Sequence, residues 1–329
     1  MILCVSLNPA VDKMVKIKKI EIGKVNRASL ESVHAGGKAI NVAFDLKLQG
    51  DETCVTGFIG GKTGSMIVDE LNQRQLDYEF VPLCTETRTN MNYIDEEGNV
   101  TEILEGGHLV DAESERRFIK LFKKLIKKSS LCVISGSLPI GLNDDFYGVL
   151  IDIAKKENIP VCLDSSDNAL YEGVSRVPYL IKPNLSELEN LTKCKYDISK
   201  LDIGINEFFE CPSFQNVMLP DMIDLRNMGI GVICVTLGDK GMILLSEKNL
   251  IICRAPKVDV VNTVGSGDCV MAALVHSLSR KASMKDTAVY ATAVSSAHVT
   301  TMNVGDIDPG LVGELMKEVE YKSYFLRKY

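Results

Sequence analysis

The segment Asn262–Asp268 contains the residues of this chain that could most directly carry out chemistry. A Gly-x-Gly loop there ends on the acid Asp268. The apolar stretch Cys269–Leu278 that follows has the composition of a helix. The first N–H groups of a helix lack partners within it and its dipole is positive there, so such a loop favours an anion. Because an acid beside a bound phosphate could accept the proton of an attacking hydroxyl, the pattern indicates a kinase site.

A simpler explanation is open for this segment taken alone. Asp is a common N-cap residue, so Asp268 could only start the helix, and Gly265 and Gly267 could only form a turn. Short motifs also match by chance. The kinase interpretation therefore depends on what the other motifs of the chain add to it.

Polar residues near the N-terminus could contact a small substrate. Asp12 lies in the loop after the first predicted strand, where a turn acid is the simpler explanation. The pair Gly36-Gly37 opens a predicted helix, with Lys38 and Asn41 on its first turn. Paired glycines let a backbone approach a ligand closely, and the two side chains offer a cation and an amide. A plain junction between a loop and a helix explains the pair equally well.

Arg88 and Ser137 are candidates for the same role. Arg88 opens a second polar segment that includes Asn90, and the planar guanidinium suits phosphate oxygens. An arginine at the surface is the commoner meaning. Ser137 belongs to the small-residue stretch Ser135–Pro139, which closes a predicted strand where a substrate would lie.

Two later strand ends could serve a nucleotide and its metal. Lys182–Glu187 closes a strand and starts a helix, so Asn184 and Glu187 could form a capping box or hold the water shell of a magnesium ion. Thr236–Gly241 ends a further strand in a glycine-flanked turn, which could accommodate a flat adenine or be only a hairpin bend.

Two glycine-containing stretches do not match known nucleotide motifs. Gly60–Thr63 lacks the first glycine of a P-loop, because Thr56 occupies that position. The loop before Asp268 does not extend to a dinucleotide fingerprint, because Val270 stands where the last glycine belongs. A Walker site and a dehydrogenase are therefore disfavoured.

Strands and helices alternate along most of the chain, which predicts a mostly parallel sheet covered by helices on both faces. Ligands in such sheets bind at the carboxyl ends of the strands, where the motifs above lie. The predicted strands are Ile2–Leu7, Thr53–Ile59, Leu131–Ser135, Val161–Asp164, Tyr179–Lys182 and Gly231–Thr236. The predicted helices are Ala39–Gln49, Ser65–Arg74, Glu113–Lys128, Asp144–Glu157 and Leu185–Leu191.

Two segments interrupt this alternation and predict a small separate sheet. Met14–His34 and Thr89–Leu104 alternate partly, and Asp95–Asn99 reads as a hairpin turn between half-exposed strands. We expect an antiparallel lid, inserted at residues 13–34 and 88–106 of a single domain that spans residues 1–329. Its apolar face needs cover from the main domain or from a second copy in a homodimer.

Composition narrows the class of protein. The chain has 329 residues, of which 46% are hydrophobic and 25% charged, with a net charge of −7. An acidic balance disfavours nucleic acid or an anionic membrane surface as a partner. The ten cysteines include no Cys-x-x-Cys pair, and the N-terminus has no signal-peptide pattern, so we expect a cytoplasmic location.

Taken in order, these motifs resemble the PfkB branch of the ribokinase-like sugar kinases, from Met1 to about Asp308. The resemblance implies a Rossmann-like three-layer α/β sandwich with a small β-sheet lid, ATP as the donor and Mg²⁺ as cofactor. Within the branch, the chain is similar to 1-phosphofructokinases and tagatose-6-phosphate kinases, which phosphorylate a ketohexose monophosphate. A catalytically silent sugar-phosphate sensor on the same fold is the alternative from another class.

The resemblance also implies roles for individual residues. Asp268 would be the base, beside an anion hole formed by Gly265, Ser266 and Gly267. Lys38 and Arg88 would bind the phosphate already on the sugar. The residues expected to contact the sugar are Asp12, Gly36, Gly37, Lys38, Asn41, Arg88, Asn90 and Ser137. Those expected to contact the nucleotide are Lys182, Asn184, Thr236, Gly238, Gly241 and Asn262, with Asn184 and Glu187 holding the metal through water.

Some positions depart from the family pattern or divide its members. Ala39 replaces a usual glycine, and no function is assigned to Ile198–Met228. Asp164–Ser166 and the stretch from Val294 to Asp308, which includes Asn303-Val304, resemble 1-phosphofructokinases, which implies fructose 1-phosphate as the acceptor, at its 6-hydroxyl. Thr101–Glu105, together with Gly265–Asp268, resembles tagatose-6-phosphate kinases instead. We expect fructose 1-phosphate, with tagatose 6-phosphate as the alternative.

Overall fold

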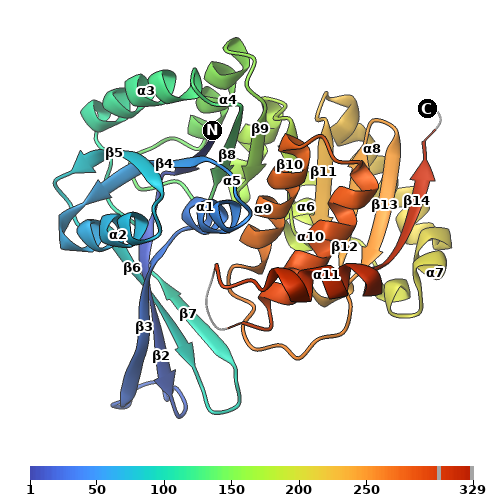
Figure 1. Cartoon of the computed structure of the whole chain (residues 1–329), viewed down its shortest axis with the longest axis horizontal. Helices are drawn as coiled ribbons and strands as arrows, with labels where there is room; N and C mark the ends of the chain where they lie inside the picture. Colours follow the sequence, from blue (N-terminus) through green and yellow to red (C-terminus); the bar gives the residue numbers. More distant parts are fainter. Residues whose placement is uncertain (302–304, 327–329) are drawn as a thin grey trace.

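The computed structural model describes residues 1–301 and 305–326, and ten strands of this part form one central sheet (Figure 1). The strands from β5 to β11 are parallel, and the three at the other edge are antiparallel. Their spatial order is β14 (Glu320–Phe325), β13 (Asn249–Arg254), β12 (Met242–Ser246), β11 (Val232–Thr236), β10 (Leu180–Ile181), β9 (Val161–Asp164), β8 (Leu131–Ser135), β1 (Ile2–Ser6), β4 (Thr53–Gly60) and β5 (Asp77–Leu83).

Helices cover both faces of this sheet, which confirms the predicted three-layer α/β architecture. One face carries α1 (Lys38–Leu48), α2 (Gly61–Gln73), α9 (Ser266–Ser279), α10 (Met284–His298) and α11 (Pro309–Glu318). The other carries α3 (Ala112–Ile126), α4 (Phe146–Lys156), α5 (Asp167–Ser175), α6 (Leu185–Thr192), α7 (Ile205–Glu210) and α8 (Leu219–Asn227). None of the helices in the described ranges is long and apolar enough to cross a membrane.

The period of two along a strand explains how one sheet supports two cores. Successive side chains of a strand point to opposite faces. In β1, Leu3 and Val5 belong to the hydrophobic cluster beneath α3 and α4, whereas Ile2 and Cys4 belong to the cluster beneath α1 and α9. All four side chains are buried, so the strand reads as a continuous apolar run, as strands covered on both faces do.

A four-stranded sheet projects from one end of the molecule and forms the lid (Figure 1). It contains, in spatial order, β3 (Ala28–Gly36), β2 (Ala10–Ile17), β6 (Arg88–Ile94) and β7 (Val100–Leu104). The predicted fully antiparallel arrangement is wrong at its centre, because β2 and β6 pair in parallel, Ala10 with Arg88. The two outer pairs are antiparallel hairpins. Only the hairpins are local in sequence, so only they could be expected from it.

The region without a predicted function, Ile198–Met228, is helical. It contains η1 (Ser199–Asp202), α7, η2 (Phe214–Met218) and α8, and buried aromatic side chains of Phe208 and Phe214 pack together at 4.7 Å between ring centroids. Short helices joined by sharp turns leave no extended period in the sequence, which is why no element was predicted there.

Candidate active site

The Gly-x-Gly loop leads into α9 as predicted, at one wall of a large cleft. Gly265 has a φ of +82° and is the N-cap residue of α9, a left-handed conformation that glycine adopts most easily. Asn262 lies behind the loop, where its Oδ1 accepts the N–H of Val264 at 3.0 Å. Asn262 was predicted to contact the nucleotide, but it is not among the described residues that line the cleft. This bond shapes the loop, and the contact of Asn262 with the nucleotide stays a prediction.

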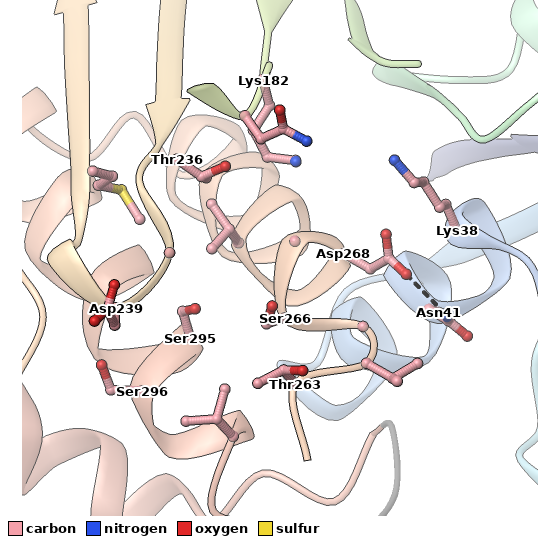
Figure 2. A pocket seen from close by; sticks show the side chains of 18 of the residues that line it. Lys38, Asn41, Lys182, Thr236, Asp239, Thr263, Ser266, Asp268, Ser295 and Ser296 are labelled. Carbon is pink, nitrogen blue, oxygen red and sulfur yellow. Dashed lines mark hydrogen bonds between the residues drawn. The ribbon is translucent and has the colours of Figure 1, made fainter. Parts of the chain in front are cut away.

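Asp268 points from the first turn of α9 toward the cleft (Figure 2). Its side chain accepts a hydrogen bond from the amide Nδ2 of Asn41 at 2.8 Å. The residue is 5% exposed, and burial raises the pKa of its carboxyl to about 7, although the ammonium of Lys38 opposes the shift. A carboxyl with a pKa near neutrality suits a general base, because it is both available and basic enough to take a proton.

A second buried acid, Asp164, holds two lysines in the same region. Its carboxylate lies 3.5 Å from the Nζ of Lys38 and 3.3 Å from the Nζ of Lys182, and it is 1% exposed. Burial acts to raise the pKa of Asp164, but the two ammonium groups outweigh it and the pKa is lowered. The same contact with Asp164 raises the pKa of Lys38. Asp164 and Lys38 are therefore charged, and Asp164 holds both lysines near the α9 loop.

Lys182 approaches the loop closely. It extends from the end of β10, opposite Lys38, in the view of Figure 2. A Cβ added to Gly267 would lie 3.3 Å from the Nζ of Lys182, so the glycine leaves room for the ammonium group. A helix start with a lysine beside it provides both N–H donors and a positive charge for an anion.

The lid closes the opposite end of the cleft with polar residues. Asp12, on β2, accepts a hydrogen bond from Nδ2 of Asn90, on β6, at 2.8 Å. Burial raises the pKa of Asp12, and the bond from Asn90 opposes that shift. Gly36 does not line the cleft in the described residues, but it packs against Asp12, because a Cβ there would lie 2.0 Å from an oxygen of Asp12. Gly36 therefore supports Asp12, and its contact with the sugar stays a prediction.

The remaining predicted residues at this end also line the cleft, which has a volume of about 1640 Å³. Ser137 accepts a hydrogen bond from the amide of Asn8 at 3.1 Å, and Arg88 lies at the root of the lid. The predicted residues that line this end are Asp12, Gly37, Lys38, Asn41, Arg88, Asn90 and Ser137. Lid residues that were not predicted line it too, namely Asn92, Val100, Glu102 and Leu104.

The far end of the cleft is bordered by the turn between β11 and β12. Thr236, Gly238 and Gly241 line it, and the turn forms η3 (Gly238–Lys240) of a hairpin. A Cβ at Gly241, where φ is +105°, would lie 2.1 Å from the carbonyl oxygen of Cys253. The sequence left open whether Thr236–Gly241 is an adenine site or only a hairpin bend. Because this hairpin turn borders the cleft, the two interpretations do not exclude each other.

Several residues on this side were not predicted. Ser295 and Ser296 come from α10, Val299 follows the last residue of α10, and Asp202 and Lys240 form an ion pair at the border of the cleft. Figure 2 shows the two serines facing the space near Asp239 and Thr263. Small serines in a helix carry no motif, so only the packing of α10 beside α9 reveals them.

Asn184 and Glu187 form the capping box that begins α6. Oδ1 of Asn184 accepts the N–H of Glu187 at 2.8 Å, and Oε2 of Glu187 accepts the N–H of Asn184 at 2.8 Å. Both residues also line the cleft. The described residues include no group of three or more His, Cys, Asp or Glu that could hold a metal alone. Any metal here would keep most of its water shell, as Mg²⁺ usually does.

Comparison with known proteins identifies the family. Residues 5–309 match the model of the pfkB family carbohydrate kinases. The chain belongs to this family. A tagatose-6-phosphate kinase of Staphylococcus epidermidis is 32% identical to it over 324 residues, which cover 97% of this chain and 99% of that protein. This pfkB family member is a carbohydrate kinase.

Solved structures share the fold at lower identity. Phosphofructokinase-2 of Escherichia coli, in complex with potassium, has a TM-score of 0.84 at 22% identity, over 97% of this chain and 98% of that one. A protein of Thermotoga maritima described as a possible 1-phosphofructokinase has a TM-score of 0.81 at 22% identity, over 99% and 100%. These similarities support the ribokinase-like α/β fold of this pfkB family member.

Proposed function

We propose that this carbohydrate kinase transfers the terminal phosphoryl group of ATP to a hydroxyl of a ketohexose monophosphate. The observation that carries the proposal is the buried Asp268, whose pKa is raised to about 7, beside the N-terminus of α9 and two lysines. Phosphoryl transfer depends mainly on positioning and on stabilising charge, so an acid and a preformed anion site suffice for it.

In this mechanism Asp268 takes the proton of the attacking hydroxyl. Asn41 holds one carboxylate oxygen by its hydrogen bond, which leaves the other oxygen for the sugar. The N–H groups at the start of α9 would stabilise the charge of the transferring phosphoryl. The N–H of Ser266 donates to the carbonyl of Thr263 at 3.2 Å, a long bond that a stronger acceptor could replace.

Lys38 has a more central place than its predicted role. Its ammonium pairs with Asp164, and Asp268 also contributes to raising its pKa. We therefore propose that Lys38 neutralises the transferring phosphoryl, and that Arg88, at the root of the lid, binds the phosphate already on the sugar. Asp12 and Asn90 would then hold sugar hydroxyls between these two positive groups.

The nucleotide would occupy the far end of the cleft, which is bordered by Thr236, Gly238 and Gly241. An open backbone fits a flat base there, since a Cβ at Gly238 would meet no atom within 4 Å. A magnesium ion would supply charge neutralisation of the phosphates. Oε2 of Glu187 accepts the N–H of Asn184, so Glu187 would hold metal-bound water through Oε1. Oδ1 of Asn184 accepts both the N–H of Glu187 and the hydroxyl of Ser186, so Asn184 could only donate through Nδ2.

Two acceptors remain to be separated. The sequence favours fructose 1-phosphate through Asp164–Ser166 and the stretch from Val294 to Asp308, within which Asn303-Val304 lies outside the described residues. Asp164 fixes two lysines at the reaction centre, so it supports the reaction more than the choice of sugar. Tagatose 6-phosphate is favoured by the name of the curated relative that matches nearly the whole chain.

The test is a comparison of kcat/KM for fructose 1-phosphate, tagatose 6-phosphate and fructose 6-phosphate, measured by ADP release with ATP and Mg²⁺. The preferred acceptor will have the highest value. Absence of turnover with all three would reject the proposal. Binding of a sugar phosphate without turnover would support the sensor alternative.

We also propose that the lid pairs with that of a second copy to form a homodimer. Leu30 and Ile103 on its strands are 60% and 55% exposed, and neither lines the cleft in the described residues. Apolar side chains exposed on a projecting sheet favour burial by a partner. Sedimentation equilibrium should give twice the monomer mass, and Ile103→Lys should shift it toward the monomer; a wild-type monomer at micromolar concentration would contradict the proposal.

A further inference from the structure

The chain enters the lid at β2 and β6 and leaves it at β3 and β7. Arg88 is the first residue of β6, and Glu105 follows the last residue of β7. Ala10, the first residue of β2, pairs with Arg88. Three of the four points at which the chain enters or leaves the lid therefore meet at Arg88. This is the end of the cleft where the sugar phosphate is proposed to bind.

The guanidinium of Arg88 connects these passages through two backbone carbonyls. Its Nε donates to the oxygen of Asn8 at 3.2 Å, and its Nη1 donates to the oxygen of Glu105 at 2.9 Å. Asn8 is anchored in turn on the main domain, because its amide donates to Ser137. A guanidinium has five N–H groups in a rigid fork, so these two bonds orient the rest of it.

Glu105 contributes more than its carbonyl. Its Oε2 accepts the backbone N–H of Thr89, the residue after Arg88, at 2.8 Å. The side chain of Glu105 thus binds the start of β6 while its main chain binds the arginine side chain. These contacts form a closed ring through Arg88, Thr89 and Glu105.

We propose that Glu105 is a positioning residue for Arg88, which it aims at the phosphate of the bound sugar while tying the start of β6 to the end of β7. This inference rests on the proposed function, because it needs Arg88 to bind that phosphate. Glu105 itself does not line the cleft in the described residues, so it acts through the arginine.

The charge of Glu105 makes this role specific. A carboxylate close to a phosphate site would repel the ligand if it were turned toward it. The bond to the Thr89 N–H keeps the side chain on the backbone of β6 instead. If positioning is what matters, a glutamine that can accept the same N–H will replace Glu105, and removal of its charge alone will have little effect.

The experiment measures the Kd of sugar phosphate without ATP, by isothermal titration calorimetry with tagatose 6-phosphate, fructose 1-phosphate and fructose 6-phosphate in turn. The variants are Glu105→Ala, Glu105→Gln, Arg88→Ala and the double variant Arg88→Ala/Glu105→Ala. Glu96→Ala, at the tip of the same lid, is the matched control. ATP is titrated separately into each variant, and Tm is recorded for each.

We expect Glu105→Ala to weaken binding of the sugar phosphate about tenfold, which is the loss typical of one hydrogen bond that orients a charged group. Glu105→Gln and Glu96→Ala should stay within about twofold of the wild type, and ATP binding should not change. The double variant should bind no more weakly than Arg88→Ala, since Glu105 has no effect once its arginine is absent.

Additive losses in the double variant would overturn the proposal, and so would equal losses in Glu105→Ala and Glu105→Gln. An unchanged Kd in Glu105→Ala would overturn it as well. The fate of the proposed function is separate: wild-type protein that binds a sugar phosphate but releases no ADP would refute the kinase reaction and leave the positioning role testable by Kd. Wild-type protein that binds none of the three would refute both.

Discussion

Among the helices that start from glycine-containing loops, α2 and α9 differ in one respect: the start of α9 faces the cleft, and the start of α2 does not line it in the described residues. α2 begins at Gly61, after Gly60, and α9 begins at Ser266, after Gly265. Both loops bring a left-handed glycine to a helix start, with φ of +66° at Gly61 and +82° at Gly265. Their sequences look alike, but the ligand that each helix start can accept is different.

The N-terminus of α2 is already occupied by a side chain of the protein. The carboxylate of Glu86 accepts the N–H groups of Lys62 and Thr63 at 3.1 and 3.0 Å, and also the hydroxyl of Thr63 at 2.9 Å. These bonds lower the pKa of Glu86, so it stays charged. The carboxylate of Glu86 is therefore already the anion that the helix dipole favours at the N-terminus of α2. At α9 the acid Asp268 is instead held by Asn41, and the loop faces the cleft.

The comparison shows that a glycine loop at a helix start can bind a phosphate only where no side chain of the protein already accepts its N–H groups. Gly60–Thr63 lacks the P-loop spacing, and the structure adds a physical reason why it is closed to phosphate. A carboxylate of the protein would have to leave before a phosphate could bind.

The largest effect is expected from Asp268→Asn. The amide keeps the shape of the side chain but cannot take a proton, so kcat should fall about a thousandfold. The Kd values for sugar phosphate and ATP should stay within about twofold. Coupled-assay kinetics and calorimetry measure the two quantities; a variant with kcat near that of the wild type would remove Asp268 from the reaction.

Substitution of one lysine near each helix start tests the difference between α9 and α2, and its expected effect on KM is of intermediate size. Lys182→Met removes a charge fixed by Asp164 beside the α9 loop, so KM for ATP should rise about tenfold or more. Lys62→Met, in the first turn of α2, should leave KM within about twofold. Initial-rate kinetics at varied ATP decide the matter, and equal effects of the two substitutions would abolish the distinction between the helices.

Glu86→Ala should change stability and leave catalysis intact. It removes the acceptor of two N–H groups at the start of α2, and loss of such a cap lowers the free energy of unfolding. Urea denaturation measures this loss. kcat/KM should stay within about twofold of the wild type, and a tenfold fall would show that α2 takes part in the reaction.

Much of the fold could be predicted because its signals are local. Leu131–Ser135 and Val161–Asp164 are short, mainly apolar runs that each end on a polar residue, and both strands have the predicted bounds. The parallel pairing of β2 with β6 could not be predicted, because Ala10 and Arg88 are far apart in the sequence, with strands and helices of the main domain between them. The pairing depends on tertiary packing rather than on any turn.

The site divides in the same way. Asp268, Lys38 and the glycine loop belong to ordered motifs, and the structure brings them to one cleft. The pairing of Asp164 with two lysines could not be predicted, because its members come from three separate elements. Gly36 and Asn262 were predicted as ligand contacts; in the described residues they do not line the cleft but contact Asp12 and Val264, which do. A sequence motif does not show whether a residue contacts the ligand or supports another residue that does.

The pH dependence of kcat/KM tests the central claim, that Asp268 is the base. Its pKa is raised to about 7 by burial, and only the carboxylate can accept a proton, so activity must fall as the pH drops below 7 and reach a plateau above it. The account predicts an ascending limb with a midpoint near 7 that is absent from the residual activity of Asp268→Asn. The same limb in that variant, or a flat wild-type profile between pH 5.5 and 8.5, would contradict it.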